Sequence, residues 1–193
     1  MEQILYGAPV AEQLDKISKN VFQEHTNKNG KPHLTAITVG DNPASLLYVS
    51  RKQEKALELG VEFNWIKLSE KTSQDDLSEL ISSESKDTDG IIIQLPLPNH
   101  LNPEEAINCI PYKVDVDGLT SYNLGSLFSE TYKLIPATSL AVLELLNYYK
   151  IKTEDKNIVI AGRSRLVSAP LAKILSSKSY NGNVSIIHSK TSN

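Results

Sequence analysis

The sequence lacks several features that would mark a secreted, membrane or nucleic-acid-binding protein. It has one cysteine, Cys109, so no disulfide can form within the chain, which is typical of a reducing compartment. No apolar run is longer than four residues, which excludes a membrane-spanning helix. The 20 basic and 23 acidic side chains give a net charge of −3 without a basic tract, so neither a nucleic acid nor a membrane is expected as a partner.

The composition is that of an ordinary globular chain. Its 193 residues are 40 % hydrophobic and 22 % charged, and this length is sufficient for a sizeable core. The start of the chain is polar and includes acidic side chains, which is typical of neither a secretory signal nor a transit peptide. We therefore expect a cytoplasmic enzyme or small-molecule binder.

Helical and strand patterns alternate along the chain, as they do in parallel sheets covered by helices. Helical signals occur at residues 10–25, 43–60, 74–84, 103–110, 138–150 and 167–177. Strand signals occur at residues 34–39, 62–67, 89–94, 157–162 and 183–188, and residues 113–125 are predicted to form a loop. Asn42 as the N-cap, Pro43 as the first helical residue and Gly60 as the C-terminal cap define the second helix. The predicted fold class is α/β.

A change in character near Leu119 suggests a domain boundary. Residues 1–119 would form a parallel-sheet α/β domain, and residues 120–193 the first part of a Rossmann-like dinucleotide-binding domain. One strand–helix–strand unit cannot cover both faces of its own sheet. We therefore expect the second part to belong to a larger domain.

Tyr48 and Lys52 lie four residues apart on the second predicted helix, so they stack one turn from each other. Open α/β sheets bind ligands beyond the carboxyl ends of their strands, where this helix starts. A lysine amine can act there as an acid or a base, and a tyrosine offers a flat face and a hydroxyl. A solvated lysine beside a surface tyrosine is the alternative. The opposite face of the helix is predicted to pack on the sheet through Leu46, Val49, Gln53 and Leu57.

Two further segments carry polar side chains that could bind a ligand. Gln94 ends the nearly all-apolar strand at residues 89–94, and its amide can hold a lysine ammonium, a water or a ligand carbonyl; a plain strand end is the alternative. Asp115 and Asp117 lie in the segment DVDG, where a carboxylate can accept two parallel donors or simply form a turn. No cluster of histidines or carboxylates has the spacing of a metal site.

The turn after the fourth predicted strand is where a dinucleotide would place its phosphates on a helix N-terminus. Of the usual glycines only Gly162 is present, so the motif is weak by itself. Arg163 can pair with a ribose 2′-phosphate, which favours NADP over NAD. His188 and Ser189, after the next strand, lie where that phosphate would bind, although His188 could also be an ordinary strand-end residue.

Taken together, five stretches resemble the bifunctional methylenetetrahydrofolate dehydrogenase/cyclohydrolase family in sequence and order. They are VGDNPASLLYVSRKQEKALELG, DGIIIQLPLP, KVDVDGLTSYNLG, AGRSRLVSAPLAKIL and HSKT. The resemblance implies NADP-dependent oxidation of 5,10-methylenetetrahydrofolate to 5,10-methenyltetrahydrofolate, and hydrolysis of that product to 10-formyltetrahydrofolate. It also implies one-carbon metabolism that serves purine biosynthesis, a small-molecule folate substrate and a homodimer.

The resemblance implies a role for each matching residue. Lys52 is the catalytic lysine, Tyr48 stacks on the folate, and Gln94 supports Lys52 and the reacting centre. Asp117 holds the pteridine ring, whose N–H donors suit a paired acceptor. The remaining contacts would come from Val49, Ile93 and Leu95 on the substrate side and from Gly162, Arg163, Ser164 and Ser189 on the cofactor side.

The sequence departs from the family pattern in three places. Residues 136–139 read PATS, where the family usually has a cysteine and a second proline. Ser168 replaces a glycine of the cofactor loop, where a side chain crowds the helix–strand approach or the pyrophosphate. Family members also continue well beyond this length, so we expect a fragment or a shortened paralogue that binds NADP poorly and turns over slowly. A cyclohydrolase without dehydrogenase activity and an inactive binding paralogue are the alternative functions.

Overall fold

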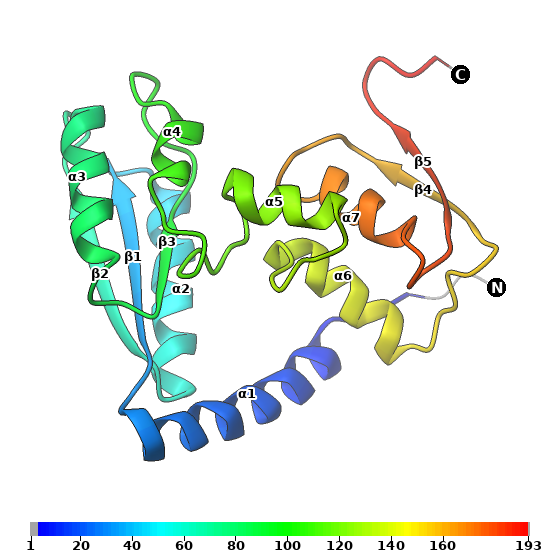
Figure 1. Cartoon of the computed structure of the whole chain (residues 1–193), viewed down its shortest axis with the longest axis horizontal. Helices are drawn as coiled ribbons and strands as arrows, with labels where there is room; N and C mark the ends of the chain where they lie inside the picture. The colour runs from blue at the N-terminus through cyan, green and yellow to red at the C-terminus, as the bar shows by residue number, and fades with distance from the viewer. Residues whose placement is uncertain (1–3, 193) are drawn as a thin grey trace. The chain divides into compact units, whose positions relative to one another are not determined.

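The computed structural model describes residues 4–192, which form two compact units (Figure 1). One unit is Gln13–Val116, and the other joins the segments on either side of it. We refer to them as the three-stranded unit and the two-stranded unit, after their sheets. The predicted boundary at Leu119 lies close to this division, and the assignment of folate and cofactor to separate domains stays a prediction.

The three-stranded unit alternates helices and strands as the sequence predicts. Its elements are α1 (Ala8–Asn29), which begins before the unit does, β1 (His33–Val39), α2 (Pro43–Glu58), β2 (Glu62–Leu68), α3 (Gln74–Glu84), β3 (Gly90–Ile93) and α4 (Pro103–Asn108). β1 lies in the centre of the sheet and pairs in parallel with β2 on one side and β3 on the other.

Helices cover both faces of this sheet (Figure 1). Because side chains alternate along a strand, neighbouring residues of β1 and β3 enter different cores. The core shared with α3 and α4 contains Ile37, Val39, Ile91 and Ile93. The core shared with α2 contains Ala36, Ile92 and Val49. The central strands are therefore buried on both sides.

The ends of α2 are fixed by the predicted local signals. The Asn42 side-chain oxygen accepts hydrogen bonds from the backbone N–H groups of Ala44 and Ser45 at 3.0 and 3.1 Å. Pro43 occupies the first helical position, where its missing N–H costs nothing. Gly60 follows the C-cap with a φ of +85°, which glycine adopts without strain.

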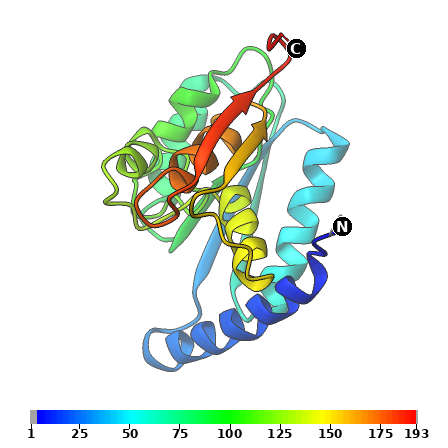
Figure 2. The same ribbon diagram turned by 90° about the vertical axis from the view of Figure 1, so that its right-hand side faces the viewer.

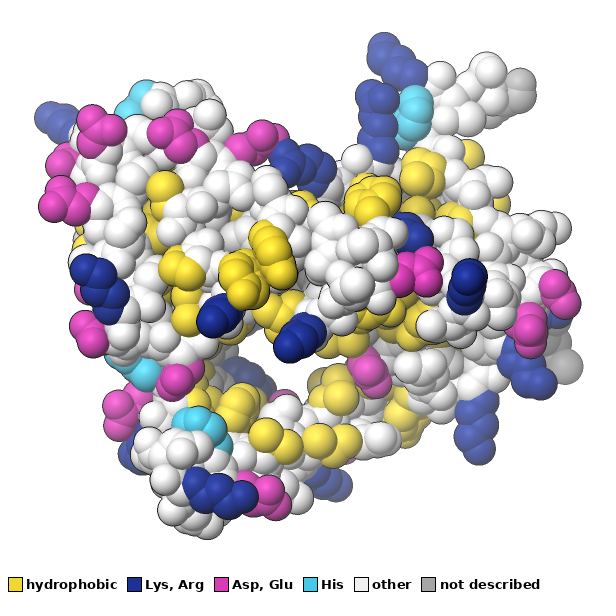
Figure 3. Space-filling view, viewed as in Figure 1, with side chains coloured by type: hydrophobic (Ala, Val, Ile, Leu, Met, Phe, Trp, Pro, Cys, Tyr) yellow, Lys and Arg dark blue, Asp and Glu magenta, His cyan; other side chains and the backbone are white. Residues whose placement is uncertain are grey.

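The two-stranded unit has one core and a sheet covered on one side. Its elements are α5 (Ser121–Phe128), α6 (Ala137–Tyr148), β4 (Asn157–Ala161), α7 (Ser168–Leu175) and β5 (Asn183–Ile187). β4 and β5 pair in parallel, with α7 behind them in Figure 2. Side chains on the open face remain at the surface, with Val159 59 % and Ile187 40 % exposed, and Figure 3 shows hydrophobic side chains over these strands.

The start of the chain belongs to the two-stranded unit, whereas the sequence analysis includes it in the domain of residues 1–119. Tyr6 and Tyr149 explain this grouping. The Tyr6 backbone N–H donates to the Tyr149 hydroxyl at 3.1 Å, and that hydroxyl donates to the Tyr6 carbonyl at 3.1 Å. Such a contact over 143 positions carries no local sequence signal.

The α/β class and all eleven predicted elements are confirmed, with small shifts at their ends. The predicted loop at residues 113–125 is wrong over its last part, because α5 begins at Ser121. The Thr120 hydroxyl accepts from the Asn123 N–H at 3.3 Å, and Leu124 and Leu127 pack on the core. Within residues 4–192, no helix is both long enough and apolar enough to cross a membrane.

Candidate active site

The face of α2 that packs on the sheet differs from the predicted one. Val49 is fully buried as expected, but Leu57 is 60 % exposed, and Ser45 and Ala56 are buried instead. Successive residues of a helix are turned by about 100°, so the buried residues Ser45, Val49 and Ala56 lie on one side of α2, and Lys52 lies on the same side. The prediction that Lys52 points away from the sheet is therefore wrong, and its side chain is half-buried.

Lys52 and Gln94 meet as the sequence predicts they could. The Lys52 ammonium donates to Gln94 Oε1 at 3.2 Å. The Gln94 amide nitrogen donates to the Leu95 carbonyl at 2.8 Å, and the Gln94 backbone N–H donates to Ile37 at 2.9 Å. The glutamine is thus held at both its backbone and its amide, which fixes the oxygen that faces the lysine.

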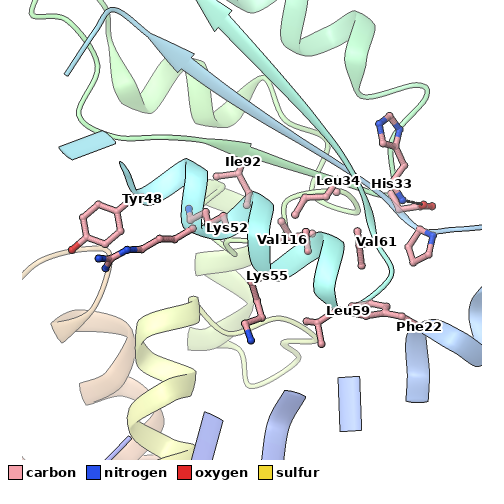
Figure 4. A pocket seen from close by; sticks show the side chains of 15 residues that line it. Phe22, His33, Leu34, Tyr48, Lys52, Lys55, Leu59, Val61, Ile92 and Val116 are labelled. Carbon is pink, nitrogen blue, oxygen red and sulfur yellow. Dashed lines mark hydrogen bonds between the residues drawn. The ribbon is translucent and has the colours of Figure 1, made fainter. Parts of the chain in front are cut away.

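A pocket of about 590 Å³ adjoins this pair (Figure 4). One wall is formed by α2 from Tyr48 and Lys52 onward, together with its C-cap Leu59, and the other walls include Phe22 of α1 and Ile92 of β3. The Tyr48 side chain is 60 % exposed, so its ring is accessible to a planar ligand. The pocket therefore places an aromatic ring and an amine on the same wall, with apolar side chains opposite them.

Some lining residues were not singled out by the sequence analysis. Arg51, Lys55 and Val116 all line the pocket. The first two follow Tyr48 at i+3 and i+7, so helical periodicity from the tyrosine would have found them. Val116 reaches the pocket only through the tertiary fold, because its neighbour Asp115 forms an isolated β-bridge with Ile91 of β3.

The remaining substrate-side residues occupy different environments. Val49 is 0 % and Ile93 5 % exposed, and both side chains pack in the cores of the sheet. Leu95 is half-buried and packs against the core shared with α3 and α4. None of these three lines the pocket. Asp117 is half-buried and begins the second segment of the two-stranded unit, and its contact with the pteridine stays a prediction.

The predicted cofactor turn follows β4. Gly162 has a φ of +138°, and its N–H donates to Ile187 of β5 at 2.7 Å. A Cβ on Gly162 would lie 2.6 Å from the Ser168 hydroxyl oxygen. The serine that replaces the family's glycine is therefore buried against a glycine, which gives it room.

The polar groups of this turn lie at one edge of the sheet. The Ser164 hydroxyl accepts from the N–H groups of Val167 and Ser168 at 3.2 and 3.4 Å, at the start of α7. Arg163 and Ser189 are both exposed. Because β4 and β5 are parallel and Ala161 pairs with Ile187, the segments that carry them leave the sheet at the same edge.

The charges around the pocket are unevenly compensated. Lys55 donates to Asp15 at 2.8 Å and to Glu58 at 2.7 Å, and these hydrogen bonds raise the pKa of Lys55 above its ordinary value.

Over residues 4–192 no three His, Cys, Asp or Glu side chains gather as a metal ion would require.

The fold and the site together define a two-part α/β protein with a lysine–glutamine pair beside a pocket in one part and a dinucleotide-type turn in the other. Residues 5–117 match the family described as tetrahydrofolate dehydrogenase/cyclohydrolase, catalytic domain. Residues 136–193 match its NAD(P)-binding domain. The chain belongs to the tetrahydrofolate dehydrogenase/cyclohydrolase family.

Individual relatives agree with this assignment. The "Bifunctional protein FolD" of Streptococcus equi subsp. equi is 39 % identical, over 99 % of this chain and 68 % of the relative. The FolD methylenetetrahydrofolate dehydrogenase/cyclohydrolase structure from Campylobacter jejuni has a TM-score of 0.95 at 33 % identity, covering 99 % of this chain and 68 % of that one. The Trypanosoma brucei FolD structure, complexed with NADP cofactor and inhibitor, has a TM-score of 0.90 at 27 % identity, covering 99 % of this chain and 66 % of that one.

Proposed function

We propose that the chain is a methylenetetrahydrofolate dehydrogenase and methenyltetrahydrofolate cyclohydrolase of one-carbon folate metabolism. The observation that carries the proposal is the 3.2 Å hydrogen bond between Lys52 and Gln94 beside the pocket. A lysine and an amide at this distance form a proton-handling pair that adds no second charge to the site. The family membership gives the substrate class.

Lys52 is the residue that handles protons in the hydrolytic step. Its amine accepts a proton from the water that adds to the methenyl carbon. The ammonium then returns a proton to N5 as the carbon–N5 bond breaks, and the hydroxyl proton of the adduct leaves to solvent, which gives 10-formyltetrahydrofolate. Gln94 holds the amine in place, and Tyr48 positions the folate ring system.

The residues after β4 and β5 fit an NADP molecule. Arg163 is an exposed cation at the carboxyl edge of a parallel sheet, which suits a 2′-phosphate. Gly162, Arg163, Ser164 and Ser189 would hold the cofactor. When bound, NADP⁺ supplies the hydride acceptor for oxidation of the methylene carbon.

The decisive experiment follows the absorbance of methenyltetrahydrofolate in the presence of the chain. Starting from methylenetetrahydrofolate, we expect it to form only with NADP⁺; starting from methenyltetrahydrofolate, we expect it to disappear faster than in buffer. Hydrolysis without oxidation would support a cyclohydrolase alone. Absence of both reactions would contradict the proposal.

We also propose a homodimer in the cytoplasm. The family resemblance supports the dimer, and the single cysteine suits a reducing compartment. Sedimentation equilibrium at micromolar concentration tests the dimer, and a mass of one chain would contradict it. Fluorescent tagging in cells tests the location.

A further inference from the structure

The wall of the pocket formed by α2 carries three cations one after another. Arg51, Lys52 and Lys55 all line the pocket, together with the exposed ring of Tyr48. Positions three and four apart lie on the same side of a helix, with Cβ atoms about 5–6 Å from each other. The cations therefore form a continuous stripe that starts beside the tyrosine.

Two of these three cations already have partners. The Lys52 ammonium donates to Gln94 at 3.2 Å, and Lys55 forms ion pairs with Asp15 and Glu58 at 2.8 and 2.7 Å. Arg51 is exposed and has no ion pair or hydrogen bond to any residue from 4 to 192.

The charge of Arg51 is not compensated by the acidic residue nearest to it in the sequence. Glu54, three residues further along α2, accepts a hydrogen bond from the Ser50 hydroxyl at 3.4 Å. A guanidinium presents a fork of N–H donors that matches a carboxylate at two points, so an unpaired arginine at a pocket favours a carboxylate ligand. The pocket interior is largely apolar, and the cations lie on the α2 wall.

A folate has the shape and charge that this arrangement requires. Its aromatic p-aminobenzoyl group joins the pteridine to one or more glutamates, and the glutamyl tail carries its carboxylates. We propose that Arg51 binds the carboxylates of the glutamyl tail, one helical turn from Tyr48. This inference rests on the proposed function, and it adds a residue that selects substrates by the length of their tail.

A contact remote from the reacting carbon affects binding more than chemistry. Loss of such a contact raises KM and leaves kcat nearly unchanged. Longer tails carry more carboxylates, so the wild-type chain should prefer a triglutamate over a monoglutamate. That preference should weaken as salt screens the exposed charges.

The test compares Arg51→Gln with the wild-type chain on methenyltetrahydrofolate that carries one or three glutamates. We expect KM for the triglutamate to rise about 5- to 30-fold, with a smaller rise for the monoglutamate and kcat within about twofold. Arg51→Lys keeps the positive charge but lacks the forked pair of N–H donors, so its KM for the triglutamate should lie between those of the wild-type chain and Arg51→Gln. Calorimetric titration with the triglutamate should show the same order of Kd values without turnover.

Lys71→Gln is the matched control, because it removes an exposed cation of the same unit outside the pocket. If Arg51→Gln and Lys71→Gln behaved alike on both substrates while the wild-type chain turned them over, the tail contact would be wrong and the proposed function would stand. If the wild-type chain turned over neither substrate, both proposals would be overturned.

Discussion

The two sheets are made from the same strand–turn–helix pattern, yet they are buried very differently. In the three-stranded unit, Ala36, Ile37 and Ile91 are fully buried, because helices cover both faces. In the two-stranded unit, Val159 and Ile187 point from equally apolar strands and remain 59 % and 40 % exposed. Hydrophobicity along a strand therefore indicates a strand, and burial depends on what covers it.

The difference also separates the two candidate sites. Lys52 and Gln94 are held between a helix and a strand of the fully covered sheet, so their geometry is fixed by packing on both faces. The cofactor turn leaves a sheet covered on one face, and its polar groups Arg163 and Ser189 are exposed. We therefore expect substitutions in the first unit to have larger effects on both chemistry and stability.

The largest expected effect is on turnover after loss of the Lys52 amine. Lys52→Met keeps much of the side-chain volume but removes the group that moves protons. We expect hydrolysis of methenyltetrahydrofolate to slow about 10²- to 10⁴-fold. Lys71→Met, in the same unit but outside the pocket, should keep wild-type turnover. If Lys52→Met hydrolysed methenyltetrahydrofolate at the wild-type rate, the proposal that the active site lies beside Lys52 would be wrong.

Stability should show the second largest contrast between the sheets. Ile37→Ala leaves a cavity at a fully buried position of β1, and we expect the free energy of unfolding to fall by about 2–5 kcal/mol. Ile187→Ala makes the same change at a 40 % exposed position of β5 and should cost about 1 kcal/mol or less. Urea denaturation followed by circular dichroism measures both, and equal losses would show that the open face is covered in solution.

Two glycines test how tightly each unit is packed. A Cβ at Gly90 would lie 2.5 Å from Val116 Cγ1, whereas a Cβ at Gly182 would lie 2.9 Å from the Leu175 carbonyl oxygen and 2.7 Å from Ile158 Cδ1. Each glycine-to-alanine change should cost about 1–3 kcal/mol of unfolding free energy.

The two clashes should respond differently to a second substitution. Val116→Ala removes the atom that Gly90→Ala meets, so the double variant should lose less stability than the sum of the single changes. Ile158→Val removes the corresponding methyl beside Gly182 but leaves the backbone oxygen, so little recovery is expected there. A full recovery at Gly182 would mean that the backbone contact is not limiting.

Local signals in the sequence predicted most of the fold. Asn42, Pro43 and Gly60 bound α2, and the apolar run before Gln94 forms the strand that is buried on both faces. α5 was missed because its cap and its leucines lie in a segment dominated by turn-forming residues. The error at Leu57 has another cause. α2 has apolar residues on more than one side, so periodicity alone does not determine which side packs on the sheet.

The site was predictable only in part. Lys52 and Gln94 lie 42 positions apart, but both are tied to the carboxyl ends of parallel strands, which brought them together in the prediction. The pocket itself was not predictable, because its walls combine Phe22, Leu59 and Val116 from separate elements. Arg51 was overlooked because a charged residue on a helix surface is ordinarily solvated.

The smallest expected effect concerns the ion pairs of Lys55, of which the one with Asp15 joins α1 to α2 and the one with Glu58 lies within α2. Its pKa is raised by hydrogen bonds to Asp15 and Glu58, so the folded chain holds this proton more tightly than the unfolded chain. The resulting stabilisation is fully present below the unfolded value of 10.5 and is lost as the pH rises through the folded value. Lys55→Met should therefore be slightly less stable than the wild-type chain near neutral pH, and the difference should shrink at high alkaline pH. Urea midpoints measured for both chains across this range test the prediction, and a difference that grew with pH would show that the ion pairs do not stabilise the folded chain in solution.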